Sequence, residues 1–162
     1  MSMEIERKFL VAQAPDIEAA NRAEIEQGYL ALGDGEGRAE VRLRRKGDQR
    51  LLTVKGGSGR TRTEEELELD RERFESLWPL TEGLRVAKTR HLIPHGEWQI
   101  ELDVYLGELD GLAIAEVEFP DEESADAFEP PEWLGEEVTG DERYLNATLA
   151  AKGLPMTAFR RH

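Results

Sequence analysis

Eight segments of this chain alternate apolar and charged residues with a period of two, and this pattern constrains the fold most. The segments are 4–11, 27–32, 40–45, 51–55, 63–69, 86–90, 98–105 and 114–119. A period of two is that of a β-strand, in which successive side chains point to opposite faces. Turn-forming pairs such as Gly47-Asp48 and Asp110-Gly111 separate the segments. The sequence therefore predicts about eight antiparallel strands.

Signals for helices are fewer. Asp70 is the expected N-cap of a helix that ends near Pro79, and residues 124–128 are a second, shorter candidate. Asp141 is the expected cap of a C-terminal helix that ends at Gly153. We expect the first and last of these helices to cover apolar faces of the strands.

Length and composition exclude several classes of protein. A chain of 162 residues fits one domain, predicted over residues 1–153, with a C-terminal tail over 154–162. The absence of cysteine excludes disulfides, zinc–thiolate sites and thiol catalysis. No apolar run approaches a membrane span and no signal segment opens the chain, so we expect a cytoplasmic protein without a membrane partner. A net charge of −14 argues against nucleic acid but leaves room for a small anion and divalent cations.

The charged positions are sorted by sign. Cations share a face in two of the segments, as the pairs Arg42 and Arg44, and Lys88 and Arg90, and in a third segment Lys55 shares a face with Thr53. Acidic sets occupy others: Glu64, Glu66 and Glu68; Glu101 and Asp103; Glu116 and Glu118. Polar outer faces of half-buried strands usually just face water. However, like charges on neighbouring positions are destabilising, so this segregation favours a multivalent anion and a divalent metal as ligands.

The two charged sets would meet in one cavity if the strands closed into a barrel. The opposite faces, which are mostly apolar, would then point outward. The predicted fold class is therefore α+β: an eight-stranded antiparallel β-barrel, or tunnel, with a charged interior and with outer faces covered by a few helices.

The ordered charged motifs resemble those of the CYTH family, also called the triphosphate tunnel metalloenzymes. The signature Glu-x-Glu-x-Lys lies at Glu4, Glu6 and Lys8. The later motifs follow in the order of the family: Arg42-x-Arg44, Thr53-Val54-Lys55, Glu64-x-Glu66, Lys88-Thr89-Arg90, Glu101-Leu102-Asp103 and Glu116-Val117-Glu118-Phe119. The resemblance covers roughly residues 3 to 152 and is greatest to short bacterial members that hydrolyse inorganic triphosphate.

This resemblance implies a tunnel that binds a small-molecule triphosphate together with Mg²⁺ or Mn²⁺, in a monomer or homodimer. The implied substrate-binding residues are Lys8, Arg42, Arg44, Lys55, Lys88 and Arg90, with Arg62 as a further phosphate contact. The implied metal ligands, direct or through water, are Glu4, Glu6, Glu116 and Glu118, with Glu64, Glu66 and Asp103 as helpers.

The hypothesis for catalysis is an in-line attack of water on a terminal phosphorus. Lys8 is the candidate that orients or deprotonates this water, and Tyr29, on the neighbouring strand, is the candidate that positions Lys8. An ordinary interior aromatic is the alternative for Tyr29. The alternative functions are a class IV-type adenylate cyclase, a thiamine triphosphatase, a nucleoside triphosphatase, and a polyphosphate or nucleotide sensor without turnover.

Overall fold

The computed structural model describes residues 5–13, 15, 21–34, 37–58 and 61–155, with the backbone alone at 57, 58, 61 and 62. The predicted metal ligand Glu4, the side chain of Arg62 and the tail from 156 onward lie outside the described part. Within that part, no helix is long and apolar enough to cross a membrane.

Among the described residues, eight antiparallel strands form one sheet, as predicted. They are β1 (Ile5–Leu10), β2 (Arg22–Leu32), β3 (Glu40–Lys46), β4 (Gln49–Ser58), β5 (Thr61–Glu68), β6 (Arg85–His95), β7 (Trp98–Tyr105) and β8 (Ala113–Phe119). Their order across the sheet is β1-β8-β7-β6-β2-β3-β4-β5. The first two strands of the chain are therefore separated by three others.

Strand β2 begins five residues earlier than residues 27–32 predict, at Arg22. Its residues 22–28 pair with 85–91 of β6, so the long-range ladder extends a segment whose local alternation is weak. The register against β3 shifts between Tyr29 and Ala31, which marks a β-bulge where the strand bends.

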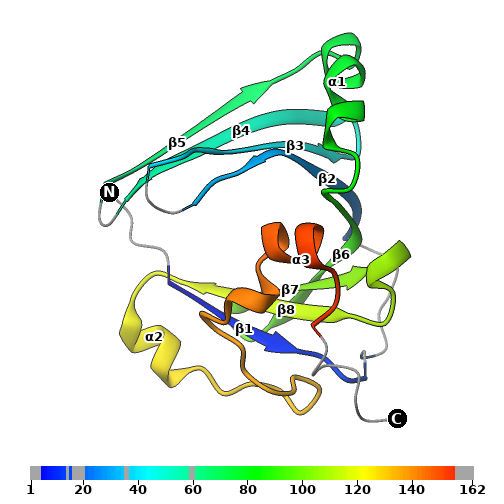
Figure 1. Cartoon of the computed structure of the whole chain (residues 1–162). Helices are drawn as coiled ribbons and strands as arrows, with labels where there is room; N and C mark the ends of the chain where they lie inside the picture. The colour runs from blue at the N-terminus through cyan, green and yellow to red at the C-terminus, as the bar shows by residue number, and fades with distance from the viewer. Residues whose placement is uncertain (1–4, 14, 16–20, 35–36, 59–60, 156–162) are drawn as a thin grey trace.

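The described sheet is curved and open rather than closed between its two end strands (Figure 1). The edge of β1 that does not pair with β8 is hydrogen-bonded to the segment 135–138, which precedes the C-terminal helix. Leu10 N donates to Glu136 O at 2.8 Å, and Val138 N donates to Lys8 O at 2.8 Å. Because these backbone groups are paired, this part of β1 has no donors or acceptors left for β5.

The three α-helices in the described part of the chain lie close to their predicted positions. Helix α1 (Arg71–Leu77) has Asp70 as its N-cap, and the Asp70 side chain accepts from Arg73 N. The helix continues into a 3-10 turn, η1 (Trp78–Thr81). Helix α2 (Glu122–Ala127) is capped by Asp121. Helix α3 (Asn146–Lys152) starts later than predicted, because Asp141 caps a separate 3-10 turn, η3 (Glu142–Tyr144). A third 3-10 turn, η2 (Gly107–Leu109), joins β7 to β8.

Two apolar clusters cover opposite faces of the sheet. The outer cluster joins α2 to the strands β1, β7 and β8; its members include Phe9, Ile100, Leu102, Val117, Phe119, Ala125 and Phe128. The inner cluster joins α3 to the other face; its members include Val86, Tyr105, Ile114, Tyr144 and Leu149.

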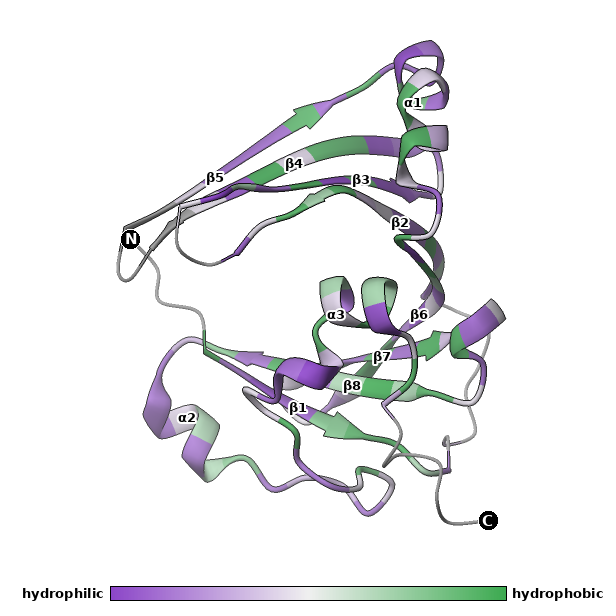
Figure 2. Cartoon of the chain, in the orientation of Figure 1, coloured by the Kyte–Doolittle hydropathy of each residue, from purple (hydrophilic) through white to green (hydrophobic). Residues whose placement is uncertain are grey.

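The expectation that the C-terminal helix covers an outward face is therefore wrong. The residues that face inward at one end of the sheet are apolar, and α3 packs on them within the curve (Figure 1). Strand β1 illustrates the change of character, since it runs from hydrophilic to hydrophobic toward Leu10 (Figure 2). Beyond this apolar end, the inward face becomes charged.

Candidate functional site

The register of the sheet places the predicted site residues on one face. In antiparallel ladders, directly paired residues share a face, and the pairs include Lys8 with Glu116 and Arg90 with Asp103. The paired residues of neighbouring strands and the alternation within each strand place thirteen predicted site residues on the same face. They are Glu6, Lys8, Tyr29, Arg42, Arg44, Lys55, Glu64, Glu66, Lys88, Arg90, Asp103, Glu116 and Glu118.

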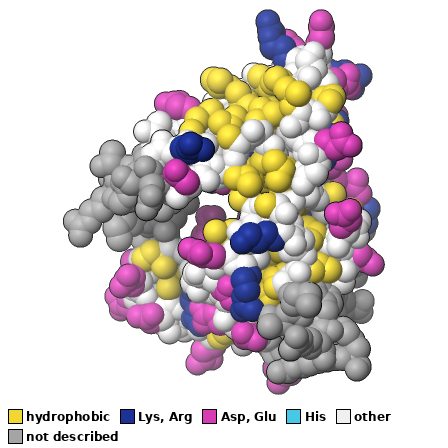
Figure 3. Space-filling view, viewed as in Figure 1, with side chains coloured by type: hydrophobic (Ala, Val, Ile, Leu, Met, Phe, Trp, Pro, Cys, Tyr) yellow, Lys and Arg dark blue, Asp and Glu magenta, His cyan; other side chains and the backbone are white. Residues whose placement is uncertain are grey.

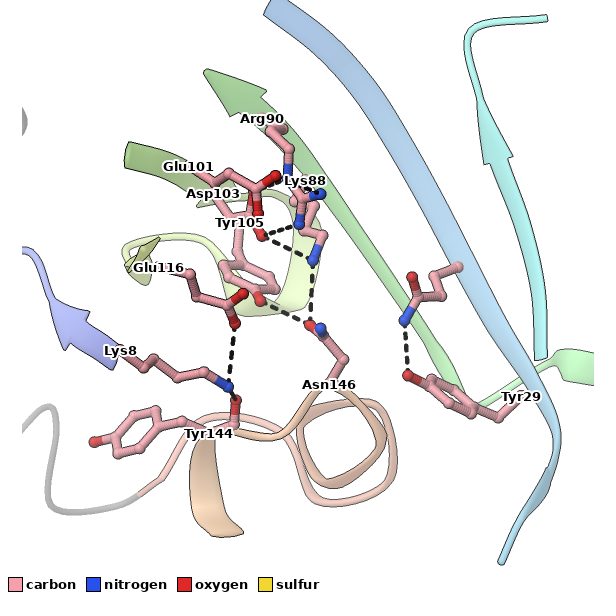
Figure 4. Close-up of polar contacts among 11 residues, drawn as sticks. Lys8, Tyr29, Lys88, Arg90, Glu101, Asp103, Tyr105, Glu116, Tyr144 and Asn146 are labelled. Carbon is pink, nitrogen blue, oxygen red and sulfur yellow. Dashed lines mark hydrogen bonds and ion pairs between the residues drawn. The ribbon is translucent and has the colours of Figure 1, made fainter. Parts of the chain in front are cut away.

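This charged face is the one that α3 approaches. Lys8 Nζ donates to Tyr144 O at 3.4 Å, and Lys88 Nζ lies 3.5 Å from Asn146 Oδ1. Figure 4 shows these side chains converging from β1, β6, β7 and β8 on the start of α3. Charged groups from distant parts of the chain thus surround one space.

A buried ion-pair network lies at the centre of the site. Asp103 accepts from Arg90 through both carboxylate oxygens, at 2.8 and 3.0 Å, and pairs with Lys88 Nζ at 2.8 Å. Burial alone would raise the pKa of Asp103, but these two cations hold it below its ordinary value. Burial lowers the pKa of Lys88, and Asp103 offsets part of that effect. Asp103 is thus the counter-ion of two cations, and its role as a helper of the metal stays a prediction.

Unsatisfied donors lie on β3 and β4, in the other half of the curved charged face. We call the space inside this curve the hollow (Figure 1). The Nε atoms of Arg42 and Arg44 and the Oγ1 atom of Thr53 are buried without a hydrogen-bond partner among the described residues. Burial and the nearby charges of Arg90 and Arg42 lower the pKa of Arg44. Buried donors almost always have partners. A cluster of mutually repelling guanidinium groups with free donors therefore fits a multivalent anion.

Carboxylates collect on β1, β7 and β8. Partial burial and the neighbouring carboxylates of Glu116 and Glu118 raise the pKa of Glu6, with a further contribution from Glu101. Mutual repulsion of this kind is relieved by a divalent cation, and oxygen ligands suit Mg²⁺ and Mn²⁺. The donor chemistry fits such an ion. In the described part of the chain, however, no three acidic or histidine side chains are grouped closely enough to ligate one ion directly.

The neighbours of Lys8 differ from the prediction. Lys8 Nζ lies 3.3 Å from Glu116 Oε1, so its immediate neighbour is a carboxylate. Tyr29 lies on β2, which pairs with β3 and β6, and its hydroxyl accepts from Gln27 Nε2 at 2.7 Å. Figure 4 shows Tyr29 apart from Lys8, across the site. The prediction that Tyr29 occupies a strand neighbouring Lys8 is wrong, because β8 takes that place.

The remaining predicted residues lie at the far end of the sheet. Lys55 pairs with Glu64 at 3.7 Å, and their side chains are 40% and 59% exposed. Glu66 is also exposed. These groups share the charged face, but they are separated from Glu116 by the order of the strands.

Two residues that the sequence did not single out also take part. The Tyr105 hydroxyl donates to Asn146 Oδ1 at 2.7 Å, next to Lys88. Burial raises the pKa of Tyr105, which keeps the hydroxyl protonated as a donor. Tyr105 shares a face of β7 with Glu101 and Asp103, so the period of two along this strand could have identified it as a site residue. Asn146 carries no such local signal.

Comparison with known proteins decides the family. A profile described as CYTH domain matches residues 2–153 of this chain. The chain belongs to the CYTH family.

Similar CYTH proteins include two curated bacterial inorganic triphosphatases. The one from Nitrosomonas europaea is 48% identical over 149 residues, which cover 91% of this chain and 96% of that protein. The one from Acetivibrio thermocellus is 40% identical over 151 residues, which cover 92% and 94%.

Solved structures agree with this assignment. A crystal structure of an inorganic triphosphatase matches with a TM-score of 0.77 at 44% identity, over 96% of this chain and 99% of its own. A putative adenylate cyclase from Bacillus halodurans, 17% identical, matches with a TM-score of 0.51 over 77% of this chain and 84% of its own. That second likeness shows the shared fold alone.

Proposed function

We propose that this CYTH protein is an inorganic triphosphatase that hydrolyses tripolyphosphate to pyrophosphate and phosphate, with Mg²⁺ or Mn²⁺. The observation that carries the proposal is the set of buried, unpaired donors on Arg42, Arg44 and Thr53, which faces the carboxylates of β1 and β8. Anion-binding and cation-binding groups are thereby combined in one hollow. The names of the two curated relatives support the same activity.

The substrate would bind along the cationic side of the hollow. Arg42 and Arg44 offer forked donors that match phosphate oxygens. Lys88 and Arg90 are held in place by Asp103 and would add charge at the centre. Lys55, at the exposed end, would contact the outer part of the chain of phosphates, and Arg62 is proposed beside it. We further propose that the curved sheet encloses the bound triphosphate as a tunnel.

The metal would be held on the acidic side, by Glu6, Glu116 and Glu118 together with Glu4. Glu64 and Glu66, on the opposite strand β5, would assist. Because direct ligands are sparse among the described residues, water is expected to complete the coordination sphere. When bound, the ion supplies charge neutralisation for the phosphate oxygens.

The reaction would be an in-line displacement at a terminal phosphorus. Water forms the new phosphorus–oxygen bond, the bond to the bridging oxygen breaks, and the water proton is lost. Lys8 Nζ, beside Glu116, would orient the water and, in its neutral form, accept its proton. The arginines would stabilise the charge that moves onto the leaving pyrophosphate. Tyr29, across the site, would line the substrate channel rather than position Lys8.

The test measures the products from tripolyphosphate, ATP, thiamine triphosphate and pyrophosphate, each with Mg²⁺ or Mn²⁺ and with a chelator control. Metal-dependent phosphate release that is fastest from tripolyphosphate is the expected result. Release of pyrophosphate from ATP without phosphate would instead indicate a cyclase. Fastest turnover of thiamine triphosphate or ATP would indicate those triphosphatases, and tight binding without product would indicate a sensor.

The proposed activity needs one domain and a small substrate. The domain 1–153 is proposed to act by itself in the cytoplasm on a small-molecule triphosphate, without nucleic acid or membrane. The net charge of −14 supports this, since nucleic acid and anionic lipid surfaces both repel an acidic protein.

A further inference from the structure

Asn146 begins helix α3, but its side chain turns into the site instead of capping the helix. Asparagine is among the residues most favoured as an N-cap, where its side chain accepts from a backbone N–H of the first turn. The N-cap of α3 is Leu145, whose side chain makes no capping hydrogen bond. Within the described part of the chain, the side-chain hydrogen bonds of Asn146 go to β6 and β7, to Lys88 and Tyr105. The Asn146 side chain is therefore placed for a task other than starting the helix.

One oxygen atom of Asn146 accepts from two donors. The Tyr105 hydroxyl donates to Asn146 Oδ1 at 2.7 Å, and Lys88 Nζ lies 3.5 Å from the same atom. An ammonium group has donors only, so the amide atom that faces Lys88 must be the oxygen. Tyr105 is buried, and its short bond holds this oxygen in place. Figure 4 shows the three side chains meeting at the start of α3.

The ammonium group of Lys88 is surrounded by three groups. Asp103 Oδ2 lies 2.8 Å from Lys88 Nζ, Asn146 Oδ1 lies 3.5 Å from it, and the centre of the Tyr105 ring lies 5.4 Å from it. An ammonium carries three N–H donors. Asp103 and Asn146 account for two of them, which leaves one without an acceptor oxygen among the described residues. The two acceptors together set the direction of this third donor.

The third donor has to meet the substrate from a buried position. Figure 3 shows the molecule hollowed on the side seen in Figure 1, with charged side chains around the opening. An exposed lysine can swing its flexible stem toward a ligand. Lys88 is buried, so the direction of its donors depends on the groups packed around it. A residue that sets this direction can therefore influence the reaction without touching the substrate.

We propose that Asn146 is a positioning residue, which directs the third N–H donor of Lys88 toward a phosphate oxygen of the substrate. This inference rests on the proposed function, because it assigns Lys88 to the triphosphate. Asp103 balances the charge of Lys88, and Asn146 sets its direction. Direction matters most in the transition state, where charge moves onto the leaving group and preorganised donors contribute most. The separation of 3.5 Å is long for a hydrogen bond, and contacts of this kind tighten when substrate is bound.

Steady-state kinetics of two variants separates positioning from a structural role. Asn146→Ala removes the acceptor, so kcat should fall by about tenfold or more, the effect of losing a hydrogen bond to a charged group. KM should change by less than about twofold, because Asp103 still holds the charge of Lys88 in place. Asn146→Asp keeps an acceptor but loses the amide donor. It should keep kcat within about threefold of the wild type and raise KM by about fivefold or more, since its charge repels the triphosphate.

Two further variants complete the comparison. Tyr105→Phe removes the bond that holds Asn146 Oδ1, so kcat should fall, but less than in Asn146→Ala. The double variant should lose no more than Asn146→Ala alone, because the two residues act on the same donor. Thr148→Ala is the matched control, a half-buried polar residue on the same helix, and it should leave kcat and KM unchanged. Alanine favours a helix more than asparagine does, and circular dichroism verifies that each variant folds.

The assays use the triphosphate that the wild-type protein hydrolyses fastest. A preference for thiamine triphosphate or ATP would contradict the proposed substrate, and the same variants would then decide the role of Asn146 on that compound. An unchanged kcat in Asn146→Ala, or additive losses in the double variant, would overturn the inference alone. An equal loss of kcat in Asn146→Asp would also overturn it, since the amide donor would then contact the substrate directly. A wild type without turnover would refute both the proposed function and the inference.

Discussion

Lys88 and Asp103 form an ion pair of 2.8 Å whose side chains are almost fully buried, with exposed fractions of 2% and 7%. Arg90 adds two hydrogen bonds to the same carboxylate. Asp103 thus holds two cations at the centre of the charged face, in a position that suits an anionic substrate. Its charge limits the cost of burying them.

Removing the carboxylate should therefore destabilise the folded protein. Asp103→Asn leaves Lys88 and Arg90 without their counter-ion, and the expected loss is roughly 3 kcal/mol in the free energy of unfolding at neutral pH. Urea denaturation followed by circular dichroism measures it. A loss no greater than that of Asp110→Asn, an exposed control, would contradict the role of Asp103 as a counter-ion.

The same pair predicts how stability depends on pH. The pKa of Asp103 is lower in the folded protein than its ordinary value of 3.8. Its stabilising contribution is therefore complete above pH 3.8 and is lost as the pH falls through the folded pKa. The difference in stability between the wild type and Asp103→Asn should shrink in that acidic range. A difference that stays constant from neutral pH downward would show that the charge of Asp103 is not what stabilises the fold.

Arg44→Ala should weaken substrate binding. Removing a forked donor to phosphate costs about 1.5–3 kcal/mol, which corresponds to a decrease in kcat/KM of roughly tenfold or more. Arg71→Ala changes an exposed arginine on α1 and provides the control. Steady-state hydrolysis of tripolyphosphate distinguishes the two. Equal activities for both variants would mean that the unpaired guanidinium group of Arg44 does not contact the substrate.

Lys8→Ala should abolish turnover while triphosphate binding is partly retained. Lys8 lies beside Glu116 and is expected to act on the attacking water rather than to supply most of the binding energy. Isothermal titration with tripolyphosphate and a chelator measures binding, and phosphate release measures turnover. Loss of binding in proportion to turnover would favour a purely electrostatic role for Lys8.

Arg7 is expected to matter for stability and not for catalysis. It points away from the site, forms a two-pronged pair with Glu137 at 2.7 and 3.0 Å, and donates to Ala125 O and Phe128 O. Arg7→Ala should lower the stability by about 2 kcal/mol, because the two carbonyl groups of the α2 region lose their partner. Arg143→Ala, which removes a surface pair with Asp141 and a contact with the Tyr144 ring, should have a smaller effect. Thermal melts compare them, and equal melting temperatures would refute the prediction.

Gly28→Ala should also destabilise the fold. A Cβ atom at Gly28 would lie 2.5 Å from Thr81 Oγ1 and 2.6 Å from Thr81 Cβ. Thr81 is fully buried and donates to Trp78 O, so it cannot move aside freely. The expected cost is about 1–3 kcal/mol by chemical denaturation. Thr81→Ala should rescue it only in part, since the Cβ atom remains; a full rescue would mean that the hydroxyl alone causes the clash.

The sequence predicted the strands and the charged face well because both depend on local geometry. The alternation of Arg42 with Leu43 fixes which side chains share a face, wherever the strand lies in the sheet. The N-cap at Asp70 is equally local, and it was confirmed. The early start of β2 at Arg22 was missed, because its pairing partner lies more than sixty residues away in β6.

The sequence by itself determined the number of strands, the segregation of charge and the family resemblance, since each can be seen within a few neighbouring residues. Only the tertiary structure decided which charges meet. It placed β8 beside Lys8 and left Tyr29 two strands beyond β7, turned α3 into the hollow, and paired Asp103 with Lys88 and Arg90. Strand order and helix docking depend on contacts between distant segments, and the local period of a strand contains no information about them.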